Sequence, residues 1–437
     1  MKINYLKFFY FVTITVLLAL TLYLIFKLSL VYYYQSLIHT EYLILLVLFS
    51  LIIFFFILFF NNSNFIVIVI SCIFTLYFCE IFLFLKKNEV LYLKHLISGD
   101  EEFKKLKIVN PNKNISKWIG PSYVYQNQDF DSDFLPLGSV SNSLVVYCNE
   151  QNYWVTYDSD RFGFNNFSYI DYKQYDFLII GDSFAEGACM QQKQTIQANL
   201  NSTGMNGVSL GKGGNSTLLN YAIFREYFNF FKPKYLIWLH YENDIGGITQ
   251  EMRSKILRKY LYDDDFKQNL IFRQKEIDLY LNSFFDKKNN NVLLHVSNDN
   301  DMSTFRKILE ILKFTKIREV IKTFAYSVDE KNYELFRIIM QKTRDTAIKH
   351  ESKFIFFYTP AYEEIYKIKR AKKMELERHK IFKILNDLNI DYFDLTEEVF
   401  FDPNNNYFPD LPDKDYSFHY NPYAYKLISD FIYSKLH

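Results

Sequence analysis

The sequence has almost no net charge and few cysteines, and each shortage excludes a class of protein. Its 437 residues carry 50 Lys and Arg against 49 Asp and Glu, a formal net charge of +1. No overall field draws such a chain to nucleic acid, and we expect no nucleic-acid partner. Four cysteines are too few for a disulfide framework. Cys148 and Cys189 are the only pair that could bridge in an aqueous domain, and we expect them to stay unbonded.

Motifs for metals and nucleotides are also missing. No group of His, Cys and carboxylate residues has the spacing of metal ligands, so we expect no metal site. Among only 13 glycines, the cluster Gly211–Gly214 lacks both the Walker lysine-serine pair and a G-x-G-x-x-G run. The sequence therefore predicts no nucleotide and no other cofactor.

Long apolar stretches are present only near the N-terminus. Residues 8–26 and 42–60 are uncharged, and residues 65–85 are interrupted only by Glu80. Each approaches the roughly 20 residues that a helix needs to cross a bilayer. A cleaved signal peptide is the weaker interpretation, because no small-residue cleavage site follows the first stretch. We predict that residues 1–86 form a transmembrane anchor of about three helices.

Charges flanking these stretches leave the orientation open. Lys2 and Lys7 favour a cytoplasmic N-terminus. With three spans, the large domain that follows would then lie outside the cytoplasm. Lys86 and Lys87 favour the opposite orientation. The very short turn 61–64 also allows the second and third stretches to form a re-entrant hairpin.

The remainder divides into a connector, residues 87–170, and an α/β domain, residues 171–437. Within the connector, residues 144–166 predict a β-hairpin around the turn 149–152. Beyond it, strands are predicted at 177–180, 207–210, 235–240, 354–358 and 391–394, with helices at 191–200, 217–231, 332–350, 363–387 and 424–436.

Short apolar strands that alternate with helices indicate an α/β fold, with a parallel sheet covered on both faces. Residues 245–330 do not fit this alternation, because they are charged and contain amphipathic stretches. We interpret them as a helical insertion over the carboxyl edge of the sheet, as a lid or a recognition wall.

Four polar motifs follow strands of this sheet. They are Gly181-Asp182-Ser183, the glycine cluster 211–214, Tyr241-Glu242-Asn243-Asp244, and a late segment with Asp413, Asp415 and His419. Each alone is typical of an ordinary turn or helix cap. Ligands of open parallel sheets bind at the carboxyl ends of the strands, where all four motifs are expected. Their common edge and order favour a functional site.

The order GDSF, glycine turn, Asn-Asp, then Asp…His-x-Asn resembles the SGNH (GDSL-like) hydrolase family over residues 175–436. The resemblance implies a flavodoxin-like parallel sheet, with Ser183 as nucleophile and His419 as base. It also implies an oxyanion hole formed by the backbone N–H of Ser183, the N–H of Gly214 and the side-chain amide of Asn243. Gly213 is an alternative to Gly214, because the register within GKGGNS is open.

Two positions depart from the family pattern. The family usually has Asp three residues before the histidine, where this chain has Tyr416. We therefore expect Asp415, four residues before, to orient His419, with Asp413 as the fallback. The family also commonly has Gly two residues before the asparagine, and here that residue is Tyr241.

The resemblance implies acyl transfer through an acyl-serine. Together with the anchor, it favours a membrane-anchored serine esterase or O-acyltransferase acting on acyl groups of cell-surface glycans, with an external or periplasmic domain. Its expected partners are the lipid bilayer and an acylated small molecule or glycan. The alternatives are a lipid esterase or thioesterase, and an inactive binding module of an envelope complex.

Overall fold

The computed structural model describes residues 74–81, 99, 101–128, 131–150, 153–167, 174–284, 313–314, 317, 328–367, 371–409 and 419–437. Within these ranges, no helix is both long and apolar enough to span a membrane. Most of the predicted anchor, and the late residues Asp413 and Asp415, lie outside them.

The chain forms two compact units. The first contains residues 1–87 and 302–324, and the second contains residues 88–301 and 325–437. In the first unit, the rings of Tyr77 and Phe314 lie 4.4 Å apart, and the Ile317 N–H donates to Glu80 Oε2 at 2.7 Å. Part of the predicted insertion thus contacts the third apolar stretch, while the predicted site lies in the second unit.

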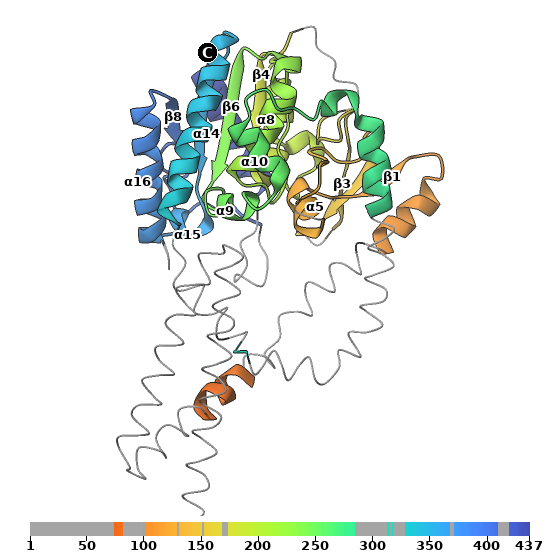
Figure 1. Ribbon diagram of the computed structural model, residues 1–437, viewed down its shortest axis with the longest axis horizontal. Helices are drawn as coiled ribbons and strands as arrows, with labels where there is room; N and C mark the ends of the chain where they lie inside the picture. The colour runs from red at the N-terminus through yellow and green to blue at the C-terminus, as the bar shows by residue number, and fades with distance from the viewer. Residues whose placement is uncertain are drawn as a thin grey trace, which may run out of the picture. The chain divides into compact units, whose positions relative to one another are not determined.

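A five-stranded parallel sheet forms the centre of the second unit (Figure 1). Its strand order is β5-β4-β6-β7-β8, which confirms the α/β fold predicted from the sequence. The strands are β4 (Phe177–Ile180), β5 (Gly207–Ser209), β6 (Tyr235–Tyr241), β7 (Lys353–Thr359) and β8 (Asp391–Asp394).

Alternate strand residues enter two separate cores, as the two-residue period of a strand requires. Leu178 and Trp238 pack in the core with α8 (Thr217–Phe231), α14 (Glu330–Lys349) and most of α16 (Ala371–Asp387). Ile179 and Ile237 pack in the core with α7 (Ile196–Ser202) and α18 (Pro422–Leu436). Because both faces are covered, strands β4, β6 and β7 read as nearly continuous apolar runs.

Several predicted helices have different bounds. The one expected at 191–200 is a short 3-10 turn, η1 (Gln192–Gln194), followed by α7. The break falls at Thr195, whose side chain accepts from the Ala198 N–H and caps α7. The helix expected at 363–387 divides into α15 (Tyr362–Ile365) and α16, and α17 (Leu395–Glu398) follows β8.

A small second sheet precedes the main one. Strand β1 (Ile115–Lys117) pairs parallel with β2 (Leu144–Cys148), and β2 pairs antiparallel with β3 (Val155–Asp158). Strands β2 and β3 form the hairpin expected at 144–166. Helix α5 (Pro121–Asn127) follows β1.

Cys148 and Cys189 form a disulfide, so our prediction that they stay unbonded was wrong. The hairpin places the end of β2 beside the loop that follows α6 (Ser183–Glu186), with the two Cα atoms 5.5 Å apart. The two cysteines are 41 positions apart in the sequence, and although they were the only pair that could bridge in an aqueous domain, the residues beside them do not show that the two segments approach each other.

Replacing both bridged cysteines by serine is expected to lower the free energy of unfolding by about 2–4 kcal/mol, because the bond restricts a long loop in the unfolded chain. Thermal unfolding with and without a dithiol measures this loss. Cys79→Ser is the control, since Cys79 is a free, exposed cysteine. Equal stability of the double variant and the parent would contradict a structural role for the bond.

The described part of the insertion, residues 245–284, joins α8 to the segment 128–141. It contains α9 (Ile248–Glu251), α10 (Lys255–Tyr262), η2 (Leu270–Phe272) and helical residues 274–284. The Gln268 amide bonds to the backbone N–H and C=O of Leu135, at 2.9 and 3.0 Å, and Asp278 accepts from Ser141. These residues pack against the connector, and residues 285–312 of the predicted insertion lie outside the described residues, so its role as a lid or a recognition wall stays a prediction.

Candidate active site

A tight turn presents Ser183 at the carboxyl end of β4. A side chain at Gly181 would place its Cβ 2.5 Å from the Leu239 carbonyl oxygen, so only glycine allows this close approach. Asp182 accepts the Phe184 N–H at 2.9 Å and caps the short helix that Ser183 begins. The apolar strand, the glycine and the cap together place the serine hydroxyl at the sheet edge.

His419 contacts this hydroxyl from the other end of the chain. Its Nε2 lies 2.8 Å from Ser183 Oγ, within the range needed for proton transfer. The backbone around it is held by Asn421, whose side chain accepts the Ala424 N–H and caps α18. The structure thus brings together the serine and histidine that the sequence singled out.

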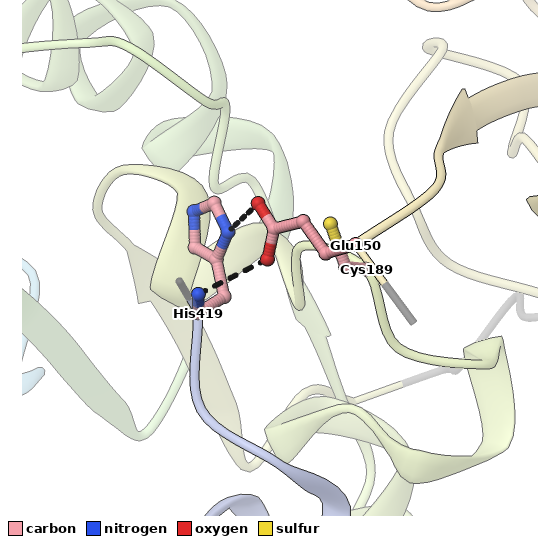
Figure 2. Close-up of side chains that lie close together, drawn as sticks. All are labelled: Glu150, Cys189 and His419. Atoms are coloured by element: carbon pink, nitrogen blue, oxygen red, sulfur yellow. Dashed lines mark hydrogen bonds and ion pairs between the residues drawn. The ribbon is translucent and has the colours of Figure 1, made fainter. Parts of the chain in front are cut away.

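Glu150 occupies the position that we expected for Asp415. Its Oε1 lies 2.9 Å from His419 Nδ1, and its Oε2 accepts the His419 backbone N–H at 3.1 Å, as Figure 2 shows. An ionised carboxylate only accepts hydrogen bonds, so this contact places the ring proton on Nδ1. Nε2 is then left with a lone pair directed at Ser183.

Sequence reasoning missed Glu150, which lies in the hairpin turn and is 269 residues from His419. A signal existed, because a bond between Cys148 and Cys189 would have brought this turn to within a few residues of Ser183. The nearest residues to the family pattern, Asp413 and Asp415, lie outside the description, so their proposed role stays a prediction.

Burial and neighbouring charge act on His419 in opposite directions. Burial lowers the pKa of the imidazole, but the Glu150 carboxylate raises it, helped by Asp182 and Glu186. The net result is a pKa above the ordinary value of 6.5. Burial, and then the charge of Asp244, also raise the pKa of Asp182 well above its usual range.

This shift predicts a pH dependence. Below its pKa the imidazole is protonated and cannot take the serine proton, so the acid limb of kcat/KM is expected above pH 6.5. Glu150→Gln removes the largest cause that raises this pKa, and the limb is expected to move to lower pH. Ester hydrolysis measured across pH 5–9 checks the direction; an unmoved limb would show that the profile reports another group.

The glycine turn distinguishes between the two candidate oxyanion donors. The Gly213 N–H already donates to Glu186 Oε2 at 2.8 Å. Gly214 adopts a φ of +74°, a left-handed conformation suited to glycine. The contacts therefore favour Gly214 over Gly213 as the donor directed at substrate.

The third motif forms a turn after β6. Asp244 Oδ2 accepts the Tyr241 N–H at 3.2 Å, and Asn243 is exposed at the turn, where its amide stays a predicted oxyanion donor. Tyr241 stacks on Phe184 with ring centroids 4.3 Å apart. That contact gives a packing reason for tyrosine where the family commonly has glycine.

Glu150, Cys189 and His419 have potential ligand atoms within 4.8 Å of one another (Figure 2). The Cys189 sulfur is bonded to Cys148, however, so it offers no thiolate. The carboxylate and the imidazole are already paired. We interpret the group as an acid–base pair beside a disulfide that holds its turn.

No protein-family model matches the chain, and no curated protein matches it. Among solved structures, the chain is similar to a protein assigned to the G-D-S-L lipolytic family from Desulfitobacterium hafniense DCB-2 (14% identity, 60% of this chain, 98% of that chain, TM-score 0.34). It is also similar to a lipase/acylhydrolase from Enterococcus faecalis (10% identity, 60% of this chain, 95% of that chain, TM-score 0.34). A third similar structure is the acetyl xylan esterase AlAXEase (13% identity, 60% of this chain, 99% of that chain, TM-score 0.32). These neighbours are of the kind that the motifs resemble. At such scores we transfer no activity or residue from them.

Proposed function

We propose that this protein is a membrane-anchored serine esterase or O-acyltransferase that acts on acyl groups of cell-surface glycans. The observation that carries the proposal is the continuous contact from Ser183 Oγ to His419 Nε2, and from His419 Nδ1 to Glu150 Oε1, at 2.8 and 2.9 Å. A serine, a histidine and a carboxylate in this order form the arrangement that activates a serine hydroxyl.

In the proposed reaction, Ser183 Oγ attacks the acyl carbonyl carbon while His419 Nε2 takes the hydroxyl proton. The carbonyl oxygen becomes an oxyanion, stabilised by the N–H groups of Ser183 and Gly214 and by the Asn243 amide. His419 then gives its proton to the departing alcohol oxygen, and an acyl-serine remains. Water or a sugar hydroxyl, deprotonated by His419, attacks this ester; the bond between the acyl carbon and Ser183 Oγ breaks, and Oγ takes the proton back from His419. Water makes the protein an esterase, and a sugar hydroxyl makes it an acyltransferase.

The proposed location outside the cytoplasm has support independent of the motifs. The domain contains the disulfide Cys148–Cys189, and disulfides persist mainly in oxidising compartments. An external domain on an N-terminal anchor would meet cell-surface glycans at the membrane. The glycan itself is proposed from the anchor and from analogy with tethered members of the family.

The first test is labelling of the full-length, detergent-solubilised protein with a fluorophosphonate, followed by mass spectrometry of the modified peptide. We expect a single adduct on Ser183 that is absent from His419→Ala. Unlabelled protein from the same preparation is then given acetylated glycans and esters of increasing chain length. Preference for chains of about eight carbons or more would favour the lipid esterase, and absence of labelling would favour the inactive binding module.

A further inference from the structure

A second charged group lies directly behind the candidate site. Glu186, the last residue of α6, is 1% exposed, and Lys212 is fully buried. Lys212 Nζ donates to Glu186 Oε1 at 2.8 Å. Two charges are costly to remove from water unless hydrogen bonds satisfy their remaining atoms.

Glu186 meets this requirement with five donors from separate parts of the chain. Oε1 accepts from Lys212 Nζ, from Trp118 Nε1 at 2.9 Å and from the Tyr157 hydroxyl at 3.3 Å. Oε2 accepts from the Tyr147 hydroxyl at 2.7 Å and the Gly213 N–H at 2.8 Å. One carboxylate, three residues from Ser183, thus connects the small sheet to the glycine turn.

The tyrosines are held as donors. Burial, and next the negative charge of Glu186, raise the pKa of both Tyr147 and Tyr157 well above the usual range. Both hydroxyls therefore keep their protons. The network has a fixed direction, with every donor pointing at the carboxylate.

The next peptide group, between Gly213 and Gly214, is held by a separate contact. The Ser122 hydroxyl on α5 donates to the Gly213 carbonyl oxygen at 3.3 Å. In a trans peptide the N–H points opposite to the C=O, so this bond directs the Gly214 N–H away from α5. Glu186 therefore fixes the Lys212–Gly213 peptide through the Gly213 N–H, and Ser122 fixes the next peptide through the Gly213 C=O. The two planes meet at the Gly213 Cα, so together they set the direction of the Gly214 N–H.

We infer that Glu186 is a positioning residue, which holds the Lys212–Gly213 peptide of the glycine turn so that the Gly214 N–H one peptide further on meets the developing oxyanion. This inference rests on the proposed function and deepens it. Ser183 and the oxyanion donor would then be aligned by one short helix, whose first residue attacks and whose last residue fixes the donor. Lys212 balances the buried charge, and Trp118, Tyr147 and Tyr157 complete its hydrogen bonds.

Glu186→Gln tests the inference because an amide cannot accept from all five donors. With its NH2 group in the place of Oε2, glutamine faces the Gly213 N–H donor to donor. Glu226→Gln is the matched control: Glu226 is 4% exposed and accepts from two backbone N–H groups and the Tyr260 hydroxyl, but its partners belong to the insertion. Both variants lose buried hydrogen bonds, and only Glu186→Gln disturbs the glycine turn.

We expect Glu186→Gln to lower kcat by about 10²-fold with little change in KM. This loss lies at the lower end of the roughly 10²–10³-fold loss in kcat that follows removal of one oxyanion donor. Glu226→Gln is expected to keep kcat within about twofold, although both variants unfold more easily. A second readout is the preference for an oxoester over the matching thionoester, whose sulfur fits an oxyanion hole poorly. That preference is expected to fall in Glu186→Gln and to persist in Glu226→Gln.

Ser122→Ala supplies a milder variant if Glu186→Gln fails to fold. It removes one hydroxyl from the Gly213 carbonyl and is expected to reduce kcat and the oxoester preference in the same direction. An unchanged oxoester preference in both turn variants, with fluorophosphonate labelling of Ser183 intact, would overturn the inference and leave the proposed function standing. No labelling of the parent protein would overturn both.

Discussion

Ser183→Ala is expected to lower kcat for ester hydrolysis by on the order of 10⁶-fold, as loss of the nucleophile does in a serine triad. No other described hydroxyl lies within hydrogen-bonding distance of His419, so no neighbour replaces it as the acyl carrier. Besides the contact with His419, the hydroxyl makes one weak bond among the described residues, to Asp182 at 3.4 Å, so the fold is expected to survive. Steady-state kinetics together with thermal unfolding measure both quantities.

The matched control is Ser202→Ala, at the C-terminal end of α7, where the hydroxyl bonds only to the Asn199 carbonyl among described contacts. It is expected to keep full activity. Substantial turnover by Ser183→Ala, with the same substrate and protein purity, would refute an acyl-serine mechanism.

Glu150→Gln is expected to reduce kcat by about 10²–10⁴-fold, the range in which loss of the orienting carboxylate falls. The amide no longer stabilises the imidazolium that forms when His419 takes the serine proton. A tenfold change corresponds to about 1.4 kcal/mol of activation free energy, so the expected loss is roughly 3–5 kcal/mol. Glu150→Asp keeps the charge on a shorter side chain and is expected to recover part of the activity.

Asp415→Asn tests whether His419 is oriented by Glu150, as the contacts indicate, or by Asp415, the residue nearest the family pattern. If Glu150 orients His419, this substitution is expected to change kcat by less than about threefold. A large loss in Asp415→Asn with little loss in Glu150→Gln would return the orienting role to the residue nearest the family pattern. Fluorophosphonate labelling rates for both variants give the same comparison without a known substrate.

Much of the fold was readable from the sequence, because its signals are local. The apolar run 177–180 followed by Gly-Asp-Ser predicts a buried strand, a turn and an exposed hydroxyl from residues that touch one another. Strands β4, β6 and β7 were identified for the same reason, since burial on both faces leaves nearly continuous apolar runs. The pair Ser183 and His419 followed from the order of motifs along one sheet edge.

Tertiary structure alone decided how this pair is completed. Glu150 reaches His419 across 269 residues, from a hairpin turn whose sequence predicts only a turn. The disulfide that holds the turn, and the carboxylate of Glu186 that occupies the Gly213 N–H, likewise join segments that carry no mark of one another. The sequence by itself determined which strand presents Ser183, because that depends on neighbouring residues. The pairing of Glu150 with His419 and the contact of the Gly213 N–H with Glu186 were decided by packing, because hydrogen bonds between distant segments exist only once the sheets have come together.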